Sequence, residues 1–203
     1  MANLEAALPE GWQLQTVENL SLRIFGGGTP STSNSAYWNG TIPWTTSALI
    51  EEDSVHLDRF QKTITTDGLE NSSSQIAPRG SVLVGTRVGV GKTAVTTLDM
   101  AINQDLTAIV PNGRTLPEFL ALCLKQPFIK AWFAGSQRGT TIKGIARKDL
   151  ARLEIPLPPI AEQQSITDVL LNVRQAKEAT ERLFQKPSLP KTGAWKGSHT
   201  PPT

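Results

Sequence analysis

The spacing of apolar and polar residues divides the chain into short strands, short helices and one long helix. β-branched residues are dense in "SVLVGTRV" (81–88), "KTAVTT" (92–97) and "DLTAIVP" (105–111), and this density predicts strands. Residues 9–25 predict a turn, a short strand and a short helix or strand. Together with the helical patterns described next, these segments place residues 1–160 in the α+β class, as a globular domain with a mixed or antiparallel sheet and short helices.

Two further segments have a helical pattern or an unusual loop composition. "LPEFLALCLKQPFIKAWFAG" (116–135) is typical of a helix, but Pro127 interrupts it and predicts two short helices. "GGGTPSTSNSAYWNGTIPW" (26–44) predicts a long polar loop with embedded aromatic residues. Loops of this length inside a compact domain usually have a function. The helical stripe consists of Phe119, Leu122, Cys123 and Leu124.

Residues 161–186 contain no Gly or Pro and carry apolar residues at alternating spacings of three and four. This heptad pattern predicts a long helix that projects from the domain and packs against another helix. The alternative is an amphipathic helix folded back on the domain. Residues 187–203, rich in Pro, Gly, Ser, Thr and Lys, predict a disordered tail. The helix seam consists of Ile166, Val169, Val173, Ala176, Thr180 and Leu183, widened by Leu170.

The composition argues against a catalytic or metal-binding protein. Among 203 residues there are one cysteine, Cys123, and two histidines, His56 and His199. These are too few and too far apart for a Cys/His zinc site or a Cys-His catalytic pair, so we expect no catalytic residue and no metal. A single cysteine and the lack of a long apolar run predict a cytoplasmic protein without a membrane segment.

The stretch "VGTRVGVGKTAV" (84–95) resembles a phosphate-binding loop at first sight. A true loop needs four residues between its first Gly and the Gly-Lys pair, but that position is Thr86 and the glycine is Gly85. The residues that follow alternate like a strand and not like the required helix. We therefore predict a β-hairpin that turns at residues 89–91.

Charge is distributed unevenly along a chain whose net charge is only +2. Residues 130–148 hold five basic residues and no acid, and residues 79–92 hold three basic residues and no acid. Solvated surface explains either stretch. The two stretches are also rich in Gly and Thr, and together they have the composition of a localised surface that contacts phosphates.

Set side by side, five segments resemble the specificity subunits of type I restriction–modification systems. The Gly-Thr-Thr turn with paired prolines before "EQQ", and the Gly-Gly-Thr-Pro loop before Ile-Pro-Trp, carry most of the resemblance. The segments are "LPEGWQLQTVENLS", "GGGTPSTSNSAYWNGTIPWTT", "GSVLVGTRVGVGKTAV", "AINQDLTAIVP" and "QRGTTIKGIARKDLARLEIPLPPIAEQQSI".

The resemblance implies one target recognition domain (1–160) and one dimerisation or partner-docking helix (161–186), the size of a half-subunit. It implies that two copies associate as a homodimer on a symmetric site in double-stranded DNA. It also implies a modification (methyltransferase) subunit and a motor-nuclease subunit as partners, with the methyl donor, ATP and Mg on those partners and no cofactor here. The alternatives are a truncated remnant, or a scaffold fragment that binds partners without reading DNA.

Short hydrogen-bonding side chains and basic groups on exposed loops are what base and phosphate contacts require. On this basis we predict the DNA-binding residues Arg87, Lys92, Arg138, Thr140, Thr141, Lys143, Thr29, Ser31, Thr32, Thr45 and Thr46.

Overall fold

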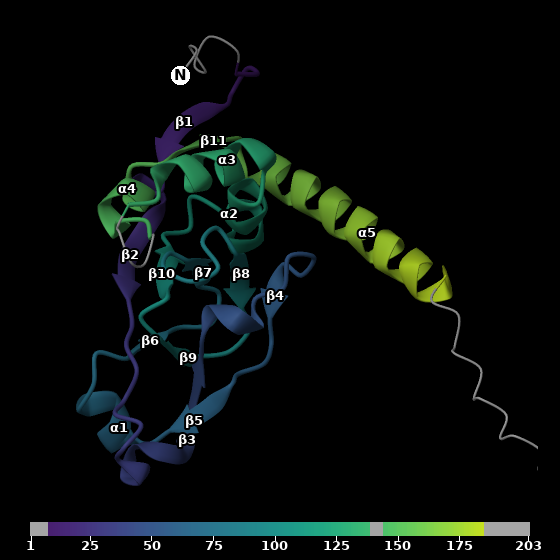
Figure 1. Cartoon of the computed structure of the whole chain (residues 1–203). Helices are drawn as coiled ribbons and strands as arrows, with labels where there is room; N and C mark the ends of the chain where they lie inside the picture. The colour runs from purple at the N-terminus through teal and green to yellow at the C-terminus, as the bar shows by residue number, and fades with distance from the viewer. Residues whose placement is uncertain (1–7, 139–143, 185–203) are drawn as a thin grey trace, which may run out of the picture.

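The structure, a computed structural model, describes residues 8–138 and 144–184. Within these residues the strands form three sheets (Figure 1). The central sheet has the order β2-β10-β7-β8-β4, and the second sheet has the order β5-β3-β9-β6. The strands of the central sheet are β2 (Ser21–Gly26), β4 (His56–Leu57), β7 (Val82–Gly85), β8 (Thr93–Thr96) and β10 (Leu106–Pro111).

The second sheet and a separate strand pair complete the β structure. The pairs β3–β9 and β4–β8 are parallel and the other pairs are antiparallel, so of the two predicted forms, mixed or antiparallel, the sheets are mixed. β1 (Gln13–Thr16) pairs with β11 (Glu154–Leu157) and so joins the two ends of the domain. The strands of the second sheet are β3 (Trp38–Thr45), β5 (Lys62–Ile64), β6 (Gln75–Ala77) and β9 (Met100–Ile102).

The helices of the domain are short. Pro117 and Pro127 each occupy the first turn of a helix, so the predicted break at Pro127 is confirmed as the start of α3. The helices are α1 (Thr66–Glu70), α2 (Pro117–Leu124), α3 (Pro127–Ser136) and α4 (Arg147–Ala151), with 3-10 turns η2 (Glu18–Leu20), η3 (Ser35–Tyr37) and η4 (Ser47–Leu49).

Both faces of the central sheet are buried. Val82 and Val84 of β7 pack in the cluster that contains the apolar residues of α2 and α3, whereas Leu83 packs with Met100 and Ile102 of the second sheet. Burial on both faces explains why β7 and β8 are continuous apolar or β-branched runs and not alternating ones.

The expectation of a loop throughout residues 26–44 is wrong for its second half, which forms η3 and β3. Trp38 and Trp44 pack edge to face, with ring centroids 5.4 Å apart, and Ile42 packs in the same cluster. A bulge between Trp38 and Ile42, with Asn39 at φ 62°, breaks the two-residue period that would have revealed the strand.

The long helix α5 (Ile160–Phe184) confirms the predicted heptad segment. Figure 1 shows it leaving the domain beside α2 and projecting away from the sheets. Ile166, Leu170 and Leu171 pack against the domain core, so the first part of the helix lies on the domain and the rest projects from it, while packing of the projecting part against another helix stays a prediction. Among the described residues no helix has the length and apolar character to cross a membrane. The predicted tail 187–203 lies outside the described residues.

Candidate nucleic-acid interface

Four strands of the central sheet end or begin in one row. The register aligns Gly26 of β2 with Thr107, Gly85 of β7 with Leu106, and Val84 with Thr93 of β8. The segments 27–34, 86–92 and 103–105 therefore all lie at the same end of the strands. We call this the loop edge.

Backbone hydrogen bonds join these segments into one surface. Thr86 N and Arg87 N both donate to Asp105 O, at 2.8 and 3.3 Å. Ile145 N donates to Thr86 O at 2.8 Å, which places residues 144–145 against the hairpin. The two acid-free basic stretches therefore meet at the loop edge, although residues 93–129 of the chain separate them.

The hairpin confirms the predicted turn. Gly89 and Gly91 have φ values of 63° and 85°, in the region that favours glycine. Gly91 N donates to Gly85 O at 2.9 Å, and the chain continues directly into strand β8. A phosphate-binding loop would continue into a helix, so this hairpin has no nucleotide-cradling geometry.

Two tryptophan side chains donate hydrogen bonds to the backbone of residues 27–34, which we call the first loop. Trp44 Nε1 donates to Gly28 O at 3.2 Å and Trp38 Nε1 donates to Ser31 O at 3.0 Å. A side chain on Gly27 would lie 1.9 Å from the carbonyl oxygen of Ile102, so only glycine permits the loop to lie this close to β9. Trp38 and Trp44 are therefore structural, and neither lies at the tip of the loop.

Polar side chains cover the tip of the first loop. Thr29 Oγ1 donates to Gln104 Oε1 at 2.7 Å, which ties this loop to the turn before β10. Ser31 and Thr32 are exposed, and Ser31 Oγ lies 2.8 Å from Ser33 Oγ. These short donors and acceptors are available to base edges at the surface.

Of the other predicted DNA contacts, two have side chains that are buried or bonded within the domain, and three lie outside the described residues. Thr45 is fully buried, and Thr46 caps η4 while donating to Gln61 Oε1 at 2.9 Å, so neither hydroxyl is available at the surface. β3 pairs with β9 at Thr45, and this pairing places the Thr45 side chain inside the domain. The predicted contacts Thr140, Thr141 and Lys143 lie outside the described residues.

The cations of the loop edge are exposed to different degrees. Arg87 and Arg138 are exposed, whereas Lys92 is half-buried with its aliphatic chain against Gly89. In the part of the chain that the structure describes, Arg87 and Arg138 have no carboxylate partner. Their charge is therefore available to an anion.

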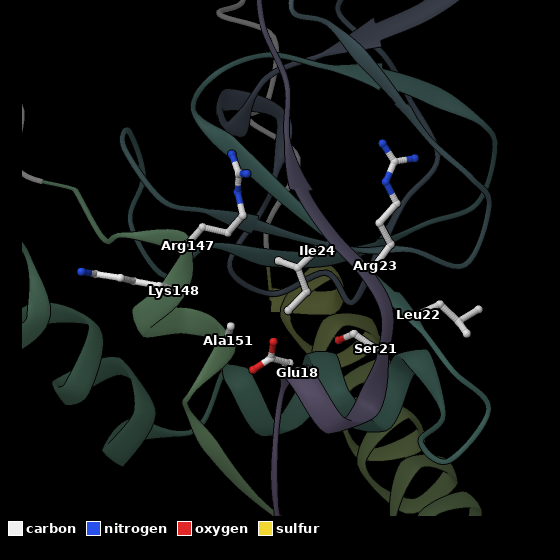
Figure 2. Close-up of a pocket in the computed structure, with 8 residues that line it drawn as sticks. All are labelled: Glu18, Ser21, Leu22, Arg23, Ile24, Arg147, Lys148 and Ala151. Carbon is white, nitrogen blue, oxygen red and sulfur yellow. The ribbon is translucent and has the colours of Figure 1, made fainter.

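A cationic cleft that the sequence analysis missed extends the loop edge along the outer side of β2 (Figure 2). A side chain on Gly26 would lie 2.8 Å from Arg147 Nη2, which places this guanidinium at the end of β2. Figure 2 shows Arg23 and Arg147 on either side of β2, both extending in the direction from Ser21 to Ile24. The cleft, of about 320 Å³, is lined by Glu18, Ser21, Leu22, Arg23, Ile24, Arg147, Lys148 and Ala151.

Glu18 is the one acid among these lining residues, against three cations. Arg23 stacks on the Phe25 ring, 4.2 Å from its centroid, and donates to Gln75 Oε1 at 2.5 Å. Arg147 and Lys148 have no carboxylate partner among the described residues. The charge of the 130–148 stretch pointed to Arg147, but no sequence signal linked it to Arg23.

Comparison with known proteins assigns the family. Residues 9–186 match the family described as the type I restriction modification DNA specificity domain. The chain belongs to this family. Over 164 residues, this specificity domain is 29% identical to the type I restriction enzyme MjaIX specificity subunit of Methanocaldococcus jannaschii, covering 80% of the chain and 38% of that relative.

Solved structures agree with this assignment. A chain in a structure described as the "structural basis underlying complex assembly and conformational transition of the type I R-M system" superposes with a TM-score of 0.65 at 26% identity. That match covers 87% of our chain and 41% of the other. The HsdS subunit from Thermoanaerobacter tengcongensis has the same fold, with a TM-score of 0.66 at 24% identity, over 88% of our chain and 41% of that one. The specificity domain thus spans about two-fifths of the length of these relatives.

The specificity domain shows no grouping of reactive side chains in its described parts. No cluster of three or more His, Cys, Asp or Glu residues suited to a metal ion occurs there. Burial raises the pKa of the Cys123 thiol to about 12, so this thiol remains protonated and poorly nucleophilic at neutral pH. His56 lies 3.2 Å from Glu118, on the far side of the sheet from β2.

Proposed function

We propose that the chain is a non-catalytic, sequence-specific DNA-binding module that reads one half of a split site in double-stranded DNA. The observation that carries this proposal is the convergence of segments 27–34, 86–92, 103–105 and 144–147 at the loop edge, with exposed cations beside short polar side chains. Bases are read by hydrogen-bonding groups, and phosphates are held by cations.

The roles divide along the surface. Ser31, Thr32 and the Thr29–Gln104 pair offer hydrogen-bonding groups to base edges, and Arg87 offers a fork that suits guanine. Arg147, Lys148 and Arg23 line the cleft along β2 and suit the phosphodiester backbone.

We also assign a pairing role to α5. Val169 and Val173 are each 61% exposed, and Ala176 and Thr180 continue the same stripe at spacings of three and four. An exposed seam of this kind suits a second helix, and two copies paired through it form a homodimer with two recognition domains. Ile166 and Leu170 face the domain core and are removed from this seam, while the Leu183 side chain lies outside the described residues.

In this proposal the chemistry belongs to partner subunits. A modification subunit that docks on α5 supplies the methyl donor and methyl transfer, and a motor-nuclease subunit that joins through the complex uses ATP and Mg. The chain itself needs no cofactor. A free Cys123 and a DNA ligand suit a cytoplasmic protein.

The test is selection of bound duplexes from a randomised DNA pool with the purified chain. We expect enrichment of one motif repeated in inverted orientation, and loss of enrichment in Arg87→Ala/Arg138→Ala. Arg59→Ala is the matched control, because Arg59 follows β4 at the opposite end of the central sheet and pairs with Glu51. A chain that binds the modification subunit yet enriches no motif is instead the scaffold fragment.

A further inference from the structure

Gln163 fastens the first turn of α5 to the domain. The residue is fully buried. Its Oε1 accepts from Leu116 N at 3.0 Å, and its Nε2 donates to Arg114 O at 3.1 Å and to Pro158 O at 2.9 Å. One amide therefore uses its acceptor and both donors to join α5 to the segment before α2 and to the turn after β11.

A second attachment lies further along the same helix, at the acidic loop of residues 51–53. Arg174 Nη1 donates to Asp53 O at 3.3 Å, and Lys177 Nζ lies 3.8 Å from Asp53 Oδ1. Residues 163 and 174 are about 16 Å apart along the helix axis. Two attachments at this separation fix both the position of α5 and its direction relative to the domain.

The acidic loop is itself anchored on the domain. Lys125 Nζ donates to Glu52 O at 3.0 Å and to Glu51 O at 3.4 Å. Lys130 Nζ donates to Glu52 Oε2 at 2.6 Å, and this hydrogen bond lowers the pKa of the Glu52 carboxyl. The loop therefore connects α5 to α2 and α3 through polar contacts, in addition to the apolar packing of Ile166 and Leu170 against the domain core.

The direction of α5 has a large effect at its far end. A helix of 25 residues spans about 37 Å, so a tilt of about 5° displaces one end by about 3 Å relative to the other. One base pair of B-DNA advances a half-site by about 3.4 Å and turns it by about 34°. A tilt of a few degrees therefore displaces one end of the helix, across its axis, by a distance comparable to the rise of one base pair.

We propose that Gln163 and the Asp53 loop are positioning elements that set the angle between the recognition domain and α5, and so set the spacer length between the two half-sites. This proposal rests on the proposed function, because it requires two paired chains on DNA. It assigns spacer selection to contacts within one chain, separate from the residues that read bases.

The experiment is the same selection from randomised duplexes, with the distribution of spacer lengths as the readout. Wild type is expected to enrich one spacer length. Gln163→Leu is expected to keep the half-site motif but spread the selected sites over at least one additional spacer length on either side. Gln164→Leu is the matched control, because Gln164 is exposed and bonds only to Asp168 of its own helix, at 2.8 Å.

A surface variant tests the second attachment without disturbing the core. Asp53→Ala/Arg174→Ala is expected to broaden the spacer distribution in the same way, and it covers the case in which Gln163→Leu does not fold. Arg182→Ala is its control, since Arg182 pairs with Glu178 within α5. A single sharp spacer in both the Gln163 and the Asp53 variants overturns the inference. Failure of wild type to enrich any inverted motif contradicts the proposed function instead, so the two failures are distinct.

Discussion

Lys125 is a buried cation whose titration affects folding. Burial lowers its pKa from the ordinary 10.5 to about 8. Between these two values the unfolded chain binds more protons than the folded one, so this residue makes the free energy of unfolding rise as pH increases from about 8 to 10.5. We expect the free energy of unfolding of wild type to increase over this range relative to that of Lys125→Met, as measured by urea titration at each pH. Parallel pH profiles for the two proteins would show that Lys125 is solvated like a surface lysine.

Arg147 is the residue through which the cationic cleft meets the loop edge. Arg147→Ala is expected to weaken DNA binding by a similar factor on every sequence, and to reduce the slope of log affinity against log salt by about 1. The measurement is a fluorescence-anisotropy titration at several salt concentrations, with Arg59→Ala as control. A sequence-dependent loss at constant salt slope would instead make Arg147 a base-reading residue.

At the level of elements, the sequence predicted those features that depend on local pattern. The hairpin 82–96, the two helices that meet at Pro127 and the long helix all follow from short-range periodicity, glycine or proline. The features that it missed depend on long-range pairing. Thr45 is buried because β3 pairs with β9, and Arg23 and Arg147 line one cleft because α4 packs beside β2.

The close approach of the first loop to β9 is specific to glycine. Gly27→Ala is expected to lower the free energy of unfolding by about 2 to 3 kcal/mol, because the new methyl group meets a backbone carbonyl that cannot move aside. Gly135→Ala is the matched control. Nothing lies near that position in α3, and alanine there is expected to raise stability by up to about 1 kcal/mol. Urea denaturation measures both, and equal effects would show that the loop adjusts freely.

In the proposed homodimer, the exposed stripe of α5 is the surface through which the two copies pair. Val173→Glu places a charge in the seam, so we expect the molar mass in light scattering to fall from twice the chain mass of 22.0 kDa to a single chain. Gln175→Glu adds the same charge about 200° around the helix and is expected to leave the mass unchanged. If both variants keep the wild-type mass, a different surface mediates pairing.

For the whole molecule, the proposed pairing would join two weak recognition events in one complex. A duplex with two inverted half-sites is expected to bind wild type about 10² to 10⁴ times more tightly than a duplex with one, because the second contact becomes intramolecular. Val173→Glu is expected to lose this gain while keeping its affinity for the single half-site. The check is a pair of titrations for each protein, and an equal loss on both duplexes would mean that the substitution damages the recognition domain.

The hydrogen bonds that assemble the loop edge have a consequence for how such a protein acquires a new target. Thr29, Arg87, Gln104 and Ile145 come from four distant parts of the chain, and each segment bonds to its neighbour. A segment exchanged between two homologues must match its neighbours in backbone length, so that the pairs at Thr86, Asp105 and Ile145 form again, and in side chain, so that the Thr29–Gln104 bond forms again. Heritable changes of target are therefore expected to occur by recombination at the borders of the entire domain, near β1 and the start of α5, and seldom by mosaic exchange within it.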